Sequence, residues 1–103
     1  MIVEIKILDR KQYSEYITKV QEIVERHGGR YIVRGGEVTP FLGDWRPERV
    51  IVIEFESLTQ WENCFRSPEY HKIAHLREES TLCRAIVVQG YQQPCIPNGK
   101  HTR

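Results

Sequence analysis

The spacing of hydrophobic residues changes along the first third of the chain. From Ile2 to Leu8 apolar and polar residues alternate loosely, and the β-branched residues favour a strand. From Tyr13 to His27 apolar residues recur every three or four positions, which predicts a helix of about five turns. Asp9 is expected to begin this helix as its N-cap, with Gln12 in the return position of a capping box.

Two glycine pairs then bracket a short apolar run. Gly28-Gly29 is expected to end the helix, because glycine adopts the left-handed conformation at no steric cost. Residues 30–38 predict a second strand that is disturbed at Gly35-Gly36. A glycine inside a strand marks a bulge or the close approach of another group. Residues 39–48 are rich in proline and glycine and predict a loop.

The second half repeats the same order of elements. Residues 49–56 predict a third strand, and Ser57 is the expected N-cap of the next helix, with Gln60 again in the capping-box position. Ser67-Pro68 interrupts this helix and restarts it, and residues 81–91 predict a fourth strand. The order β-α-β-β-α-β is that of an α+β, ferredoxin-like sandwich, in which two helices cover one face of a four-stranded antiparallel sheet.

The predicted strands carry apolar residues on both faces. In the third strand, Val50 and Val52 lie opposite Ile51 and Ile53. Two helices cover only one face of a sheet, so a second apolar face is left exposed. Such a face marks an interface, and we expect two copies to pair through it as a dimeric α/β barrel.

Composition narrows the range of partners and compartments. Residues 1–92 are expected to form one domain and residues 93–103 a tail. A net charge of +1 argues against a nucleic-acid partner, and no apolar run is long enough to cross a membrane. Cys64, Cys83 and Cys95 include no close pair, so reduced thiols and a cytoplasmic location are expected.

Four motifs together resemble a known family. They are the segment His27–Gly36, the Gly-Asp-Trp turn at 43–45, the strand segment 49–55, and Ser-Pro-Glu-Tyr at 67–70. In this order they resemble a widespread family of uncharacterised small proteins in the dimeric α/β-barrel superfamily, over about residues 1–91. The resemblance implies the ferredoxin-like fold and the face-to-face dimer, but no catalytic residue. Cofactor-free monooxygenases, lactone isomerases, polyketide cyclases and haem-degrading enzymes of that superfamily are analogies of fold only.

Arg34 and Glu54 are candidates for opposite roles. Arg34 precedes a glycine pair, where its guanidinium is placed to clamp a carboxylate or enolate by a bidentate contact. Glu54 lies in an apolar strand, where burial would raise its pKa toward that of a general acid or base. The structural alternative is that the two side chains pair with each other, or Glu54 with Arg49.

The remaining candidates lie on the second predicted helix. His71 and His75 share a helix face, a spacing that suits a metal, but the sequence fixes no third ligand, so no metal is expected. A single histidine is suited to moving a proton. Tyr70 is placed to donate to an oxyanion, although aromatic residues more often serve packing.

These residues lead to two main hypotheses. The first is a small cofactor-independent enzyme of isomerase, cyclase or monooxygenase type, acting by acid/base chemistry on a small organic acid, lactone or aromatic ketone. Its catalytic residues would be Arg34, Glu54, His71 and Tyr70, and its ligand-binding residues Gly35, Gly36, Trp45 and Tyr31. The alternative is a non-catalytic dimeric module that binds a small ligand.

Two further expectations accompany these hypotheses. No cofactor is expected, because no phosphate-binding glycine motif opens a helix. The second expectation is a third hypothesis, weaker than the two above, in which the chain is an interaction protein. A positioned carboxylate at a cavity would favour the enzyme, and a cavity without an acid or base would favour the binding module.

Overall fold

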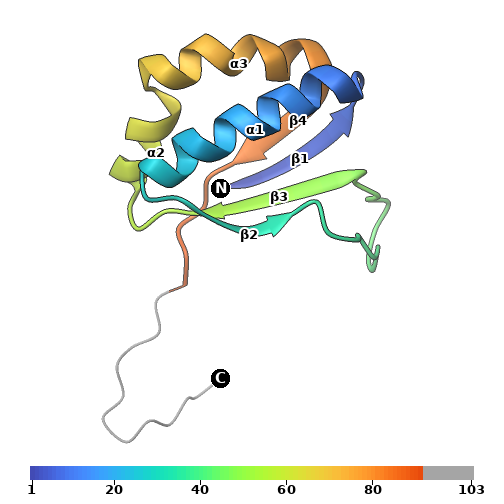
Figure 1. Ribbon diagram of the computed structural model, residues 1–103. Helices are drawn as coiled ribbons and strands as arrows, with labels where there is room; N and C mark the ends of the chain where they lie inside the picture. Colours follow the sequence, from blue (N-terminus) through green and yellow to red (C-terminus); the bar gives the residue numbers. More distant parts are fainter. Residues whose placement is uncertain (92–103) are drawn as a thin grey trace, which may run out of the picture.

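The chain folds as two layers, a sheet and a layer of helices that covers one of its faces (Figure 1). The computed structural model describes residues 1–91, so the expected tail at 93–103 lies outside them. The four strands are antiparallel in the order β2-β3-β1-β4, which confirms the predicted α+β, ferredoxin-like sandwich. The elements are β1 (Ile2–Ile7), α1 (Arg10–Arg26), β2 (Arg30–Arg34), β3 (Arg49–Glu54), α2 (Leu58–Phe65), α3 (Pro68–Ser80) and β4 (Thr81–Ile86).

Within residues 1–91 the structure has three helices, because the interruption predicted at Ser67-Pro68 divides the second predicted helix into α2 and α3. Ser67 separates α2 from α3 because its backbone is extended and its side chain begins a new helix. The three predicted N-caps are confirmed: a backbone N–H three residues on donates at 3.1 Å to the side chains of Asp9, Ser57 and Ser67. These caps satisfy N–H groups that the first helical turn leaves without partners.

The predicted capping boxes are wrong in their return half. The Gln12 side chain donates instead to Glu79 of α3, at 2.7 Å. The Gln60 side chain accepts from the backbone N–H of Glu56, at 3.0 Å, one residue before the cap. Each glutamine side chain therefore bonds to a neighbouring segment. Of the two hydrogen bonds of each expected capping box, the one accepted by the N-cap side chain is formed and the return bond is not.

The first glycine pair ends α1 as predicted. Gly28 has a φ of 82°, and its N–H donates to the carbonyl of Glu25 at 3.1 Å. The N–H of Gly29 donates to the carbonyl of Val24 at 2.8 Å, which completes a Schellman cap. A side chain at Gly29 has no room, because its Cβ would lie 2.5 Å from Val24 and 2.8 Å from the Phe55 ring.

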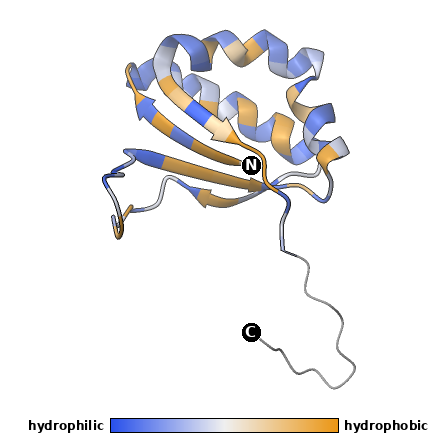
Figure 2. Ribbon diagram, turned by 180° about the vertical axis from the view of Figure 1, so that it is seen from behind, coloured by the Kyte–Doolittle hydropathy of each residue, from blue (hydrophilic) through white to orange (hydrophobic). Residues whose placement is uncertain are grey.

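The core lies between the sheet and the helices. Val3, Ile5, Ile51 and Ile53 point from the two central strands toward α1 and α3 and are nearly fully buried. The hydropathy pattern of the sheet and the helix layer is visible in Figure 2.

The opposite face of the sheet is uncovered within residues 1–91. Leu82 is 61% exposed there and Ile86 is 62% exposed. The face also carries charge, because Glu4 and Arg84 form an ion pair on it at 2.6 Å and Lys6 lies beside them.

Two predicted strands extend too far. The second ends at Arg34 and the fourth at Ile86, because pairing stops there. The segment that follows β2 is a long loop that descends on the side of the sheet away from the helices (Figure 1). In this loop Phe41 is 90% exposed and Leu42 is 76% exposed. No helix within residues 1–91 is long and apolar enough to cross a membrane.

Candidate functional site

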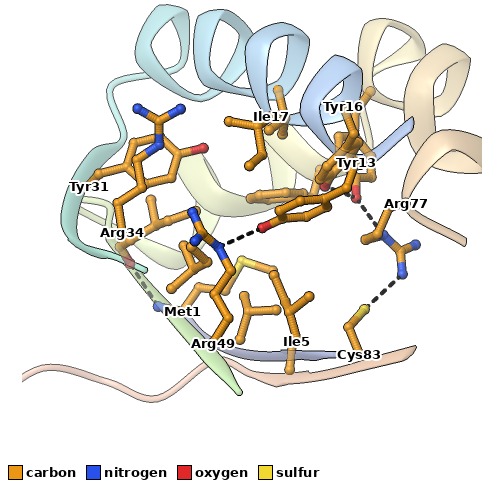
Figure 3. A pocket seen from close by; sticks show the side chains of 17 residues that line it. Met1, Ile5, Tyr13, Tyr16, Ile17, Tyr31, Arg34, Arg49, Arg77 and Cys83 are labelled. Carbon is orange, nitrogen blue, oxygen red and sulfur yellow. Dashed lines mark hydrogen bonds between the residues drawn. The ribbon is translucent and has the colours of Figure 1, made fainter. Parts of the chain in front are cut away.

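A cavity of about 240 Å³ lies between the helix layer and the sheet (Figure 3). Most of its wall is aliphatic and aromatic, and the polar groups are concentrated in a few long side chains. These polar groups are four phenols, three guanidinium groups and one thiol, from Tyr13, Tyr16, Tyr31, Tyr70, Arg34, Arg49, Arg77 and Cys83.

A bulge in β2 brings two of these groups to the same face. Tyr31 pairs with Ile53 and Val33 pairs with Val52, so Ile32 is an extra residue in the strand. Without this bulge, Tyr31 and Arg34 would point to opposite faces of the sheet. With it, both line the cavity, and the Arg34 guanidinium carbon lies 5.5 Å from the centroid of the Tyr31 ring.

Arg49, the first residue of β3, reaches the cavity beside this pair. Its Nε donates to the Tyr13 hydroxyl at 3.0 Å, and its guanidinium carbon lies 5.6 Å from the centroid of the same ring. Gly35 makes room for this side chain: a Cβ there would overlap the Arg49 guanidinium, and the φ of 73° suits glycine. The second glycine pair therefore marks a close approach, while the bulge lies earlier, at Ile32.

Arg77 of α3 holds the other end of the cavity. Its Nε donates to the Tyr70 hydroxyl at 3.1 Å, and its Nη1 donates to the Cys83 sulfur at 3.3 Å. The Tyr70 and Tyr16 hydroxyls are hydrogen-bonded at 2.9 Å. The result is a continuous chain of polar contacts from β4 through α3 to α1, set in otherwise apolar surroundings.

Three phenols of this cavity, those of Tyr13, Tyr16 and Tyr31, stay protonated at neutral pH. Burial raises the pKa of Tyr31 to about 12, although Arg34 lowers it. Burial also raises the pKa of Tyr16, and the hydrogen bond with Tyr70 raises it further. Burial raises the pKa of Tyr13 as well, although the nearby Arg49 lowers it. These hydroxyls therefore act as hydrogen-bond donors and acceptors, not as bases.

The cavity is positively charged and lacks a counter-charge among residues 1–91. Its lining there includes no aspartate, glutamate or histidine. The ion pairs formed by these residues join Lys19 to Glu15, Arg26 to Glu69, Arg30 to Glu54 and Arg84 to Glu4, all away from the cavity. Arg34, Arg49 and Arg77 thus face the cavity with no carboxylate of the described residues within 4.0 Å. Arg34 is exposed and Arg49 and Arg77 are partly buried, so water solvates part of this charge. A carboxylate that replaces this water would form charge-assisted hydrogen bonds with the guanidinium groups, which favours an anionic occupant.

The structure brings some of the predicted site residues together and separates others. Arg34, Tyr31 and Tyr70 line the cavity, and Gly35 supports it through Arg49. Glu54 does not reach it. It lies on the opposite face of the sheet, where its half-exposed carboxylate pairs with Arg30 at 2.6 Å. The structural alternative, in which Glu54 pairs with Arg34 or Arg49, is therefore wrong in its partner, which is Arg30.

Three more predicted residues lie outside the cavity. His71 is exposed on α3, because the turn that buries Tyr70 directs the next residue outward. Trp45 is 56% exposed on the loop after β2, and Gly36 has no atom within 4 Å of the position a Cβ would take. Since none of them lines the cavity, any role for them in binding or catalysis there stays a prediction.

The sequence reasoning missed five of the polar residues of this cavity, namely Tyr13, Tyr16, Arg49, Arg77 and Cys83. Tyr13 and Tyr16 belong to the apolar stripe of α1 and Arg77 to the inward stripe of α3. An arginine on an inward helical stripe was the available signal, since such a charge needs a partner. Arg49 carried no comparable signal, because its contact with Tyr13 depends on how α1 crosses the sheet.

The described residues offer no ready metal site. No group of three or more His, Cys, Asp or Glu side chains within residues 1–91 is placed to hold a metal ion. His71 and His75 are both exposed on α3. Cys64 is buried and Cys83 is partly exposed, and both are free thiols. Cys95 lies outside the described residues.

The fold and the cavity define a small ferredoxin-like protein with a pocket between its helices and its sheet. By its sequence the chain belongs to the DUF1330 family, a domain of unknown function, whose model matches residues 1–91. No curated protein matches the chain.

Two solved structures share the fold. A protein of unknown function from Rhodopseudomonas palustris, RPA0582, superposes with a TM-score of 0.68 at 18% identity, over 89% of this chain and 83% of that one. The structure of methylated RPA0582 gives a TM-score of 0.60 at 15% identity, over 87% of this chain and 83% of that one. At these identities the likeness is one of fold.

Proposed function

We propose that this protein binds a small organic anion in the cavity between its helices and its sheet. The observation that carries the proposal is the set of three arginines that face the cavity without a carboxylate partner among residues 1–91. A guanidinium group holds a carboxylate through two parallel hydrogen bonds, and these bonds are strongest where water is excluded. A carboxylate ligand would supply the charge that the lining lacks.

The rest of the wall supports a ligand with an apolar body. Val3, Ile5, Ile51 and Ile53 form the sheet side, and the rings of Tyr13, Tyr16, Tyr31 and Tyr70 supply flat apolar surface. Pockets of this kind take most of their affinity from apolar contact and their orientation from a few polar groups. An aromatic or short aliphatic carboxylic acid combines both features at a size that suits about 240 Å³.

The enzymatic hypothesis needs a group that transfers a proton at the cavity. Glu54 and His71 do not line it, and the raised pKa values of Tyr13, Tyr16 and Tyr31 make these phenols poor bases at neutral pH. Acid/base catalysis on an organic acid, lactone or ketone would then rest on Tyr70, hydrogen-bonded to Arg77, as donor to an oxyanion. Binding requires none of these steps, and we propose it as the function.

Binding is tested by thermal unfolding in the presence of matched acids and amides. Benzoate should raise the melting temperature, and benzamide should not, because only the acid offers a charge to the guanidinium groups. At a hundredfold excess over its Kd, a ligand of the folded state stabilises it by about 2.7 kcal/mol, which is roughly 10 °C or more for a domain of this size. Equal shifts with both compounds, or no shift with either, would contradict the proposal.

We also propose that two copies pair through the uncovered face of the sheet. Leu82 and Ile86 lie exposed on this face, and its charges are partly matched by the ion pair between Glu4 and Arg84. The loop after β2 descends on the same side in Figure 1, and its residue Phe41 is 90% exposed. A second copy, which carries the same surface, can cover it by twofold symmetry.

Sedimentation velocity tests the pairing. The unaltered chain should sediment as a dimer at micromolar concentration, and the double variant Leu82→Lys, Ile86→Lys as a monomer, because four buried charges would meet without partners. Leu58→Lys is the matched control, since Leu58 is 58% exposed on α2 and should leave the dimer intact. A dimer that survives the double substitution would place the interface elsewhere.

A further inference from the structure

The three arginines of the cavity are divided between two ends. Figure 3 shows Arg34 and Arg49 toward one side of the cavity and Arg77 with Cys83 at the other. The register of the sheet explains this separation. Ile5 of β1 pairs with Arg49 on one side and with Cys83 on the other. Since neighbouring strands lie about 4.8 Å apart, the backbones of β3 and β4 are separated by roughly 10 Å.

Each end is built in the same way. Arg49 is held by the hydroxyl of Tyr13, and Arg77 by the hydroxyl of Tyr70, in both cases through Nε. A guanidinium held at Nε is fixed in orientation and keeps most of its N–H donors for another acceptor. Arg77 spends one more donor on the Cys83 sulfur, which is a weak acceptor.

The wall between the two ends is apolar. Ile5 lies in the sheet between Arg49 and Cys83, and the Tyr13 and Tyr16 rings, 6.3 Å apart, lie above it on α1. A ligand with one carboxylate would satisfy one end and leave the other guanidinium against this wall without a counter-charge. A ligand with a charge at each end satisfies both.

Resting on the proposed function, we infer that the ligand of this cavity is a dicarboxylate with an apolar spacer. Arg34 and Arg49 bind one carboxylate, and Arg77 with the Tyr70 hydroxyl binds the other. The spacer lies over Ile5, beneath the Tyr13 and Tyr16 rings.

Isothermal titration of the full chain with matched acids tests this inference. The pairs are hexanoate with hexanedioate, and benzoate with benzene-1,4-dicarboxylate. The diacid should bind at least about tenfold more tightly than its monoacid, because it adds a charge-assisted contact at the second end. A diacid that used only one end of the cavity would still bind about twofold more tightly than its monoacid, because it carries two equal carboxylates. The ratio of the two affinities must therefore exceed this statistical factor of about two.

Substitutions assign the second carboxylate to its arginine. Arg77→Met should reduce the ratio of diacid affinity to monoacid affinity to about twofold or less. Arg30→Met is the matched control, because it removes a positive charge that is paired with Glu54 outside the cavity and should keep the preference. If Arg77→Met does not fold, the ratio of diacid affinity to monoacid affinity measured on the unaltered chain tests the inference by itself.

The outcomes separate the inference from the function on which it rests. Equal affinity for monoacid and diacid overturns the inference and leaves an anion-binding cavity in place. A diacid preference that survives Arg77→Met in a folded variant also overturns it. The absence of binding by all four acids at millimolar concentration overturns both the inference and the proposed function.

Discussion

Replacing the buried Gly29 by alanine is expected to destabilise the fold more than a methyl group added at an exposed glycine would. The added Cβ would lie 2.5 Å from the Val24 side chain and 2.8 Å from the Phe55 ring. Val24 is completely buried, so it has no space into which to move. Overpacking of this kind costs about 2–3 kcal/mol, or roughly 10–20 °C in melting temperature for a chain of this length.

Gly36→Ala is the matched control for this effect. Gly36 belongs to the second glycine pair and has no atom within 4 Å of the position a Cβ would take, so alanine there should change stability by less than about 1 kcal/mol. Chemical denaturation of both variants makes the comparison. If Gly29→Ala unfolds at the same denaturant concentration as Gly36→Ala, the tight packing around Gly29 against Val24 and Phe55 is wrong.

Removal of the two guanidinium groups at the β2–β3 end should abolish most of the affinity for a carboxylate. In Arg34→Met, Arg49→Met the apolar stems remain and the charges are lost. Each charged hydrogen bond contributes about 1.5–3 kcal/mol, so the double variant should bind benzoate at least about 100-fold more weakly. Isothermal titration measures the change directly.

Arg30→Met again serves as the control for this variant, because Arg30 lies on the same strand as Arg34 but pairs with Glu54 on the other face. Its affinity for benzoate should stay within about twofold of that of the unaltered chain. Circular dichroism establishes that both variants are folded. A folded double variant that binds benzoate as well as Arg30→Met does would remove these arginines from the site.

The elements of this fold could be predicted because their signals are local. An N-cap such as Asp9 acts on an N–H three residues away, and the glycine pair at 28–29 closes α1 on carbonyls of its own last turn. The order of strands and helices then restricts the topology to a ferredoxin-like sandwich. The ends of β2 and β4 were less predictable, since they depend on where a neighbouring strand stops pairing.

The site was harder to predict because its geometry is not local. The bulge at Ile32 is set by pairing with β3, and it decides that Arg34 and Tyr31 share a face. Glu54 pointed away from the cavity because strict alternation from the buried Ile53 directs it there. That alternation was readable in the sequence, but which face the helices cover was not.

Packing between helices accounts for the remaining cavity residues. Tyr16 and Tyr70 meet because α1 crosses next to α3, and Arg77 follows Tyr70 by seven residues, two turns along the same face. Sequence periodicity placed each of these residues on an inward stripe. Only the structure brings the three together around one polar chain.

The most direct measurement follows the guanidinium groups themselves. In a two-dimensional NMR titration with benzoate, the Nε–Hε signals of the cavity arginines Arg34 and Arg49 should shift together and saturate with a single Kd. The signals of Arg30 and Arg84, which are paired with Glu54 and Glu4 outside the cavity, should stay in place. Small shifts of all four signals that grow without saturation would mean that the cavity binds no organic anion.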